Sequence, residues 1–298
     1  MKIAAQCTHG LALRFGYEKL FRMYKEAGFD GVDVSLGDMI HEDSPFNLNG
    51  YKEYAQNIRN IADSVGIKIH QTHAPFVYPL DKWETSPALM SILKRSIEIS
   101  GILGAEVEVI HPYHHPEFLG HEDEIFEKNM EYYSELLPTA RANNVKIGVE
   151  NMFQNDPIRK TIVHDTCSRL CEFIKYIDTL NDEYAVACLD IGHIALLYQQ
   201  DQPWDFIKGL GHDRLKSLHV HDNSLISDQH QIPFQGKIDW LKVTKALGEI
   251  DYDGYFTYET LGHINACPDD FVPIHIRYMA DIAKYLGALV DKARPQNN

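Results

Sequence analysis

The stretch Tyr51–His73 reads YKEYAQNIRNIADSVGIKIHQTH and decides the fold. In its first part apolar residues return every three or four positions, which predicts an amphipathic helix over Tyr51–Val65. Gly66 then permits the left-handed turn that ends a helix. The short strand-like run that follows predicts a strand over Ile67–His73. The stretch is therefore one helix, one tight turn and one strand that stops at a histidine.

The same unit returns along the rest of the chain. Glycine-bearing joints between a helix and a strand recur at 27–32, 103–107 and 251–255. Strands are predicted at Lys2–Gln6, Gly31–Ser35, Ile67–His73, Glu106–His111, Lys146–Asn151, Tyr184–Asp190, Leu215–His221 and Gly254–Glu259. Helices are predicted between them at Tyr17–Ala27, Tyr51–Val65, Ala88–Leu103, Glu122–Asn143, Cys167–Leu180, Trp204–Leu210, Asp239–Glu249 and Phe271–Leu286. Eight alternating units without a Ser/Pro-rich linker predict an α/β fold, a single (β/α)8 TIM barrel domain over residues 1–298.

The composition is that of an ordinary globular protein: 44% of the 298 residues are hydrophobic and 24% are charged. The formal net charge is -15 and no basic run occurs, which argues against nucleic acid as a partner because backbone binding draws on clustered Lys and Arg. The N-terminal MKIAAQCTHG is too short for the apolar core of a signal peptide, and no stretch approaches the roughly 18 apolar residues of a membrane span. We therefore expect a cytoplasmic enzyme without a membrane partner.

The five cysteines are scattered and show neither zinc-ribbon nor redox CxxC spacing, so we expect reduced thiols. Cys167 and Cys171 lie four residues apart on a predicted helix. We expect them to share a face and to serve packing rather than metal binding. Neither a GxGxxG after the first strand nor a P-loop is present, which excludes the common dinucleotide and Walker sites.

An acid or a histidine stands at the end of six predicted strands. These residues are His73, His111, Glu150, Asp190, His219 and Glu259. In a closed barrel the carboxyl ends of the strands meet at one mouth, so these side chains would converge. Carboxylate and imidazole ligands together suit a hard or borderline divalent cation. The alternatives are a buried Glu–Arg or Glu–Lys pair for each glutamate and a structural role for each lone histidine.

Three local phrases add candidates. In CLDIGH, residues 188–193, His193 follows Asp190 closely enough for both to reach the mouth, although Asp190 could instead cap the next helix with His193 facing solvent. In LHVHDN, residues 218–223, His219 and His221 share a strand face; His219 is the better ligand, and His221 stands behind it or contacts substrate. Asp228 and His230 could grip one ion from an extended loop, or lie in a solvated loop without a role.

These residues, in this order, resemble those of the xylose-isomerase-like TIM barrel superfamily of sugar phosphate isomerases and epimerases, which also contains endonuclease IV. The resemblance to the epimerases implies one Mn²⁺-like ion held by Glu150, Asp190, His219 and Glu259. The resemblance to endonuclease IV implies two further zinc ions, one at His73, His111 and Glu150 and one at His193, Asp228 and His230. The chain departs from the epimerases at Leu225, where they usually carry an arginine.

The resemblance implies a divalent-metal-dependent isomerase or epimerase of a small ketose, polyol or keto-inositol, with Mn²⁺ as the first choice of metal and Zn²⁺, Co²⁺ or Mg²⁺ as alternatives. Glu150 and Glu259 would transfer a proton through a metal-stabilised enediolate. The residues expected to contact the sugar are His193, His73, His111 and Trp83, with Phe76 or Tyr78 packing on its apolar face. Alternatives are a trinuclear zinc phosphodiesterase, a lyase or dehydratase of keto sugars, and a sugar-binding protein without activity. The expected partners are a small carbohydrate and further copies of the chain in a homo-oligomer.

Overall fold

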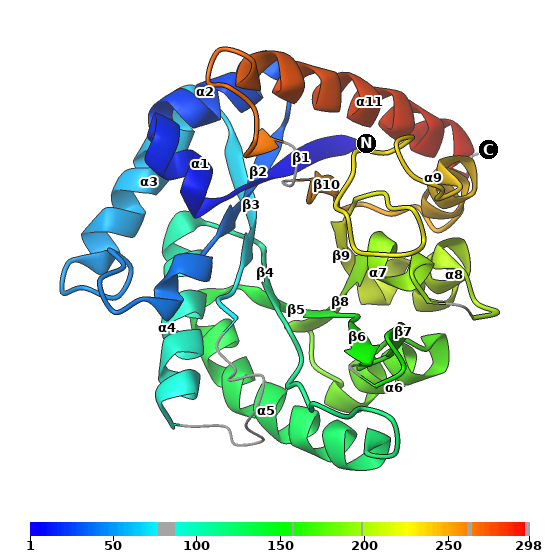
Figure 1. Cartoon of the computed structure of the whole chain (residues 1–298). Helices are drawn as coiled ribbons and strands as arrows, with labels where there is room; N and C mark the ends of the chain where they lie inside the picture. The colour runs from blue at the N-terminus through cyan, green and yellow to red at the C-terminus, as the bar shows by residue number, and fades with distance from the viewer. Residues whose placement is uncertain (77–86, 157, 198, 261–263, 296–298) are drawn as a thin grey trace.

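The computed structural model describes residues 1–76, 87–156, 158–197, 199–260 and 264–295, and it is built around one parallel sheet (Figure 1). The strands of this sheet are β1 (Lys2–Cys7), β2 (Gly31–Ser35), β3 (Lys68–His73), β4 (Val107–Ile110), β5 (Lys146–Glu150), β8 (Ala185–Asp190), β9 (Leu215–His219) and β10 (Tyr255–Tyr258). Beyond the end of β9, the Val220 N–H donates to the Thr257 carbonyl at 2.9 Å, and the Glu259 N–H donates to the Val220 carbonyl at 3.1 Å. These bonds join the last two strands, so the sheet is the predicted (β/α)8 barrel.

Helices surround the barrel and connect successive strands (Figure 1). They are α2 (Tyr17–Ala27), α3 (Tyr51–Val65), α4 (Pro87–Leu103), α5 (Glu122–Asn143), α6 (Leu170–Leu180), α8 (Pro203–Arg214), α9 (Trp240–Glu249) and α11 (Val272–Ala293). The opening stretch folds as predicted: α3 ends at Gly66, whose φ of 75° and ψ of 35° are left-handed, and β3 follows. A search of the described residues for a helix long and apolar enough to cross a membrane finds none.

Along each strand, alternate side chains face the helices on one side and the barrel interior on the other. On β5, Ile147 and Val149 belong to the apolar layer between the sheet and the helices. Gly148 and Glu150, which alternate with them, face the barrel interior, where a Cβ on Gly148 would lie 3.3 Å from the Cβ of Cys188 on β8. Each inward-facing position at the end of a strand therefore lies at the mouth of the barrel.

Four short elements were not expected from the sequence. They are α1 (His9–Phe15), the 3-10 helix η1 (Gly37–Ile40), α7 (Ile191–Ala195) and an antiparallel hairpin of β6 (Phe153–Asp156) and β7 (Thr161–His164). The hairpin follows β5 and rises beside the mouth of the barrel (Figure 1). It is the largest departure from a plain (β/α)8 arrangement within the described ranges.

The prediction that Cys167 and Cys171 share a helix face is wrong. Cys167 is buried and has a φ of 59°, whereas α6 begins at Leu170 and carries an exposed Cys171. The chain turns before the helix because the Ser168 N–H donates to the Asp165 carbonyl at 3.1 Å, and the Ser168 hydroxyl accepts from the Asp165 N–H at 3.2 Å. Cys7, Cys167, Cys171 and Cys188 form no disulfide bond among the described residues.

Candidate metal centre at the barrel mouth

Four of the strand-end residues form one cluster. Glu150, Asp190 and His219 end β5, β8 and β9, and Glu259 follows β10 directly. One ligand atom of each lies within 4.8 Å of those of the other three. His219 is central, because its Nδ1 lies 3.1 Å from Glu150 Oε1, 3.4 Å from Glu259 Oε2 and 3.9 Å from Asp190 Oδ2. The structure thus brings together the set implied by the family resemblance.

The surroundings of Glu150 fit a cation better than the alternative of a Glu–Arg or Glu–Lys pair. Its side chain is 1% exposed, and its ion-pair contacts among the described residues are all with histidines. Its Oε2 faces imidazole nitrogen atoms and no lysine or arginine of the described residues. A buried carboxylate without such a cationic partner is costly, and three carboxylates with an imidazole are ligands for a divalent cation.

A second group shares Glu150 with the first. The Nε2 atoms of His111 and His73 lie 3.0 Å and 3.6 Å from Glu150 Oε2. The Nδ1–H of His73 donates to the carbonyl of Ala74 at 2.8 Å, which leaves Nε2 to face the carboxylate. His73 and His111 therefore occupy the positions expected of ligands for an additional ion, and both are buried.

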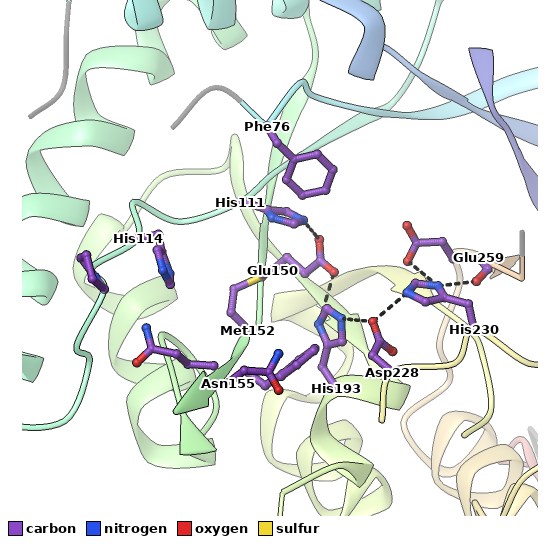
Figure 2. A pocket seen from close by; sticks show the side chains of 13 residues that line it. Phe76, His111, His114, Glu150, Met152, Asn155, His193, Asp228, His230 and Glu259 are labelled. Atoms are coloured by element: carbon purple, nitrogen blue, oxygen red, sulfur yellow. Dashed lines mark hydrogen bonds and ion pairs between the residues drawn. The ribbon is translucent and has the colours of Figure 1, made fainter. Parts of the chain in front are cut away.

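A third group contains His193, Asp228 and His230, as predicted, and also His221. Asp228 Oδ2 lies 2.8 Å from His230 Nε2 and 3.6 Å from His193 Nε2, as Figure 2 shows. His221 Nε2 lies 3.0 Å from Asp190 Oδ1 and 3.6 Å from Asp228 Oδ1. His221 therefore stands between the first and third groups, a place that the sequence left undecided.

In CLDIGH, residues 188–193, Asp190 was expected either to reach the mouth of the barrel or to cap the next helix, and the structure shows that it does both. Asp190 caps α7, since its Oδ1 accepts from the His193 N–H at 2.7 Å. The His193 ring nevertheless does not face solvent, because only 7% of the side chain is exposed and its Nδ1–H donates to the Asn151 carbonyl at 2.9 Å. The hydrogen bond of the cap therefore helps to orient the His193 side chain toward the mouth of the barrel.

Carboxylates and imidazoles of the cluster shift each other's pKa toward their charged forms. Burial raises the pKa of Glu150, but the imidazoles of His219 and His111 outweigh it and hold this pKa well below its usual range. Burial lowers the pKa of His193, but neighbouring carboxylates, Asp190 first, raise it to about 10. The lowered pKa of Glu150 and the raised pKa of His193 favour pairing of a carboxylate with an imidazolium, so a cation that binds through such an imidazole must displace a proton.

Comparison with known proteins identifies the family. A family profile described as "Xylose isomerase-like TIM barrel" matches residues 21–282. The chain belongs to this family. An uncharacterized protein of Methanocaldococcus jannaschii is 31% identical over 246 residues, which cover 78% of this chain and 75% of that protein.

Two solved structures of sugar epimerases or epimerase-like proteins show the same fold. A D-tagatose 3-epimerase-like protein superposes with a TM-score of 0.70 at 20% identity and covers 98% of this chain and 99% of its own. The 3-keto-D-glucoside 4-epimerase of E. coli superposes with a TM-score of 0.68 at 16% identity, covering 96% of this chain and 99% of its own. At these identities the likeness concerns the fold.

The loop that carries the third group is fixed by one buried carboxylate. Asp222 accepts from the N–H groups of Phe234 at 3.0 Å and Ile238 at 3.1 Å, and from the Trp240 indole at 2.9 Å. Gly236 is required beside it, because a Cβ there would lie 2.2 Å from Asp222 Oδ1. The alternative was a solvated loop without a role for Asp228 and His230. The hydrogen bonds to Asp222 argue against it, because they hold the two ends of this loop together.

A cavity of about 510 Å³ opens above the cluster in this family member. Of the aromatic residues expected to pack on the sugar, Phe76 lines the cavity and packs edge-on against His111 with ring centroids 4.3 Å apart. Tyr78 and Trp83 lie outside the described residues. The remaining wall comes from residues without an expected role. These are His114, Pro116, Met152, Phe153, Gln154 and Asn155.

The sequence contained a signal for the hairpin wall. Two short strand-like runs, FQND and TIVH, are separated by the turn-forming PIRK at 157–160. The predicted arginine position of the epimerases, Leu225, is 44% exposed and does not line the cavity.

Proposed function

We propose that this protein is a divalent-metal-dependent isomerase or epimerase of a small ketose, polyol or keto-inositol. The observation that carries the proposal is the convergence of Glu150 and Glu259 on His219 beside a cavity. Two carboxylates from different strands can flank one carbon of a bound sugar. Family membership and the epimerases among the structural neighbours support the same class of reaction.

The residues that would hold the cation are Glu150, Asp190, His219 and Glu259. We favour Mn²⁺, with Zn²⁺, Co²⁺ and Mg²⁺ as alternatives, because the set is rich in oxygen and contains no thiolate. When bound, a divalent cation supplies Lewis acidity that polarises a carbonyl and the hydroxyl beside it.

Glu150 and Glu259 would exchange the proton of the carbon next to the carbonyl. Each carboxylate has two oxygens, so one can serve the cation while the other serves the proton. On Glu259 the two are already distinguished: Oε1 accepts from the Gln6 side chain at 3.1 Å, and Oε2 faces His219. One glutamate removes the proton and the other returns it on the opposite side of the sugar.

The substrate would lie between the cluster and the hairpin. His193, His111 and His73 could donate to its hydroxyl groups, and Phe76 could cover an apolar face of the ring. Among the described residues that line the cavity none is a lysine or an arginine, which favours a sugar without a phosphate group.

The test is proton exchange with solvent. We expect Glu150→Gln and Glu259→Gln to lower deuterium uptake from D₂O into ketoses such as D-tagatose and D-fructose by roughly 10²–10⁴-fold. Glu108→Gln is the matched control, because Glu108 is buried on the outer face of β4 and does not line the cavity. Wild-type exchange in both site variants would refute the two-glutamate scheme.

One observation favours a second candidate, a trinuclear zinc phosphodiesterase of the endonuclease IV type. The second and third groups are assembled as completely as the first. Three metal ions could activate a hydroxide and stabilise a phosphoryl transition state. Three zinc ions per purified chain with cleavage of abasic DNA would establish this candidate over the isomerase; one ion and no DNA binding at physiological salt would exclude it.

A lyase or dehydratase of keto sugars begins with the same proton removal and differs in what leaves afterwards. Product analysis separates it from an isomerase, because elimination releases water or a fragment and isomerisation conserves the mass of the substrate.

A further inference from the structure

His219 is oriented differently from the other histidines of the mouth. His73, His193 and His230 each donate Nδ1–H to a backbone carbonyl, at 2.8 Å, 2.9 Å and 2.8 Å, and present Nε2 to the carboxylates. His219 presents Nδ1 to Glu150 instead, and its Nε2 points toward the barrel interior. A histidine that binds a metal is usually held by a partner on its other ring nitrogen.

The group that faces His219 Nε2 is the carboxylate of Asp33, with Oδ2 at 3.7 Å. Asp33 lies on β2 and is completely buried, as is His219. Asp33 Oδ1 has no hydrogen-bond partner within the described ranges, and no lysine or arginine among those residues forms an ion pair with Asp33. A buried carboxylate without a cationic side chain is costly, so a role in the site explains it better than packing does.

A chain of hydrogen bonds holds the Asp33 carboxylate. The amide nitrogen of Gln71 on β3 donates to Asp33 Oδ2 at 2.8 Å, and its oxygen accepts from the hydroxyl of Ser217 on β9. His219 Nε2 has no hydrogen-bond partner among the described residues and faces Asp33 Oδ2 at 3.7 Å, slightly beyond hydrogen-bonding distance.

We propose that Asp33 is a positioning residue of the metal site: it faces Nε2 of His219 and favours a proton there, so that Nδ1, which lies 3.1 Å from Glu150 Oε1, is the nitrogen that exchanges its proton for a cation. Gln71 and Ser217 hold the Asp33 carboxylate in place. This inference rests on the metal site of the proposed function, but it concerns the orientation of a ligand and not the substrate.

The first measurement is Mn²⁺ affinity by titration calorimetry. We expect Asp33→Asn to weaken binding roughly 10–100-fold, because the neutral amide oxygen that takes the place of Oδ2, held there by the Gln71 NH₂ group, attracts a proton on Nε2 less strongly than a carboxylate does. Ser217→Ala, which removes only the far donor, should weaken binding about threefold to fivefold. Asp38→Asn is the matched control: Asp38 is also a buried carboxylate near a histidine and a serine, with His9 Nδ1 at 3.5 Å and Ser44 Oγ at 2.6 Å, but outside the cluster.

The second measurement is the ¹H–¹⁵N spectrum of histidine-labelled, zinc-loaded protein. In the wild type we expect a slowly exchanging, downfield Nε2 proton that is absent from His219→Asn. It should shift upfield or exchange out in Asp33→Asn but not in Asp38→Asn. A purely structural role for Asp33 would lower thermal stability without moving this signal.

The outcomes are distinct. Wild-type protein that binds no Mn²⁺ or Zn²⁺ overturns the proposed function itself. Wild-type affinity and an unchanged Nε2 signal in Asp33→Asn overturn only the role of Asp33. If Asp33→Asn does not fold, Ser217→Ala decides: unchanged affinity with an unchanged signal overturns the inference, and weaker binding supports it.

Discussion

Replacing Asp228 by asparagine should remove a pH-dependent part of the stability of the metal-free protein. Asp228 Oδ2 lies 2.8 Å from His230 Nε2, and 19% of its side chain is exposed. Burial lowers the pKa of His230, but the hydrogen bond to Asp228 and the charge of Glu259 raise it to about 9. The variant removes the first of these two raising causes.

The sign and size follow from linkage. The unfolded pKa of histidine is about 6.5, so the stabilisation is fully present below pH 6.5 and is lost as the pH rises through about 9. This difference corresponds to roughly 3.4 kcal/mol. Because 29% of the His230 side chain is exposed, solvent screens the charge, and we expect about 2 kcal/mol.

The assay is urea unfolding of chelator-treated protein at pH 6.5 and pH 9.5. Wild type should lose about 1 kcal/mol more over this interval than Asp228→Asn, because Glu259 and Asp190 still raise the pKa of His230 in the variant. Glu108, whose pKa burial raises to about 8, titrates alike in both proteins. Asp228 is also one of the causes that raise the pKa of His193 to about 10, so its loss there acts in the same direction. Asp38→Asn should keep the wild-type loss. Equal losses in wild type and Asp228→Asn, or a wild type that becomes more stable toward pH 9.5, would refute the reasoning.

Three further outcomes are expected. Gly192→Ala should destabilise the protein by about 1–3 kcal/mol in urea unfolding, because its Cβ would lie 1.9 Å from His221 Cε1; Gly50→Ala, with no atom within 4 Å, is the neutral control. Asp222→Asn should loosen the loop that carries the third group, since an amide has one acceptor oxygen for the four donors that bond to the carboxylate. Hydrogen exchange of residues 223–238 should rise about tenfold, and protection equal to wild type would contradict this. Mn²⁺ at 100 times its dissociation constant should stabilise wild type by about 2.7 kcal/mol over chelator-treated protein, whereas no shift in the unfolding midpoint would argue against a metal site.

The positions of the strand-end residues at the barrel mouth could be predicted because they follow from two periodicities of the sequence. Alternation along a strand decides which side chains face inward, and the βα repeat decides that the strand ends meet at one mouth. His73, Glu150 and Asp190 are each the last residue of a strand in the structure. Their convergence needed no knowledge of the register between strands.

Other parts of the site depend on details that no local pattern contains. The start of α6 was misplaced because a turn at Asp165–Ser168 competes with the helix through side-chain bonds to the backbone. Asp33, Gln71 and Ser217 come from three strands, and their contact depends on the relative stagger of β2, β3 and β9, including a register shift between Val32 and Asp33. The sequence shows three polar residues in strands without showing that they meet.

The three ligand groups form one connected system, which bears on how many metal ions the mouth can hold. Glu150 belongs to both the first and the second group, and Asp190 belongs to the first while contacting His221 of the third. A cation in the first group would engage both carboxylates and so change what each offers to its neighbour. His73, His219 and Glu259 form a fourth combination of candidate ligands, which overlaps the first and second groups. Because a first cation would reduce the negative charge that the shared carboxylates offer to the next, we expect any further ion to bind with lower affinity than the first.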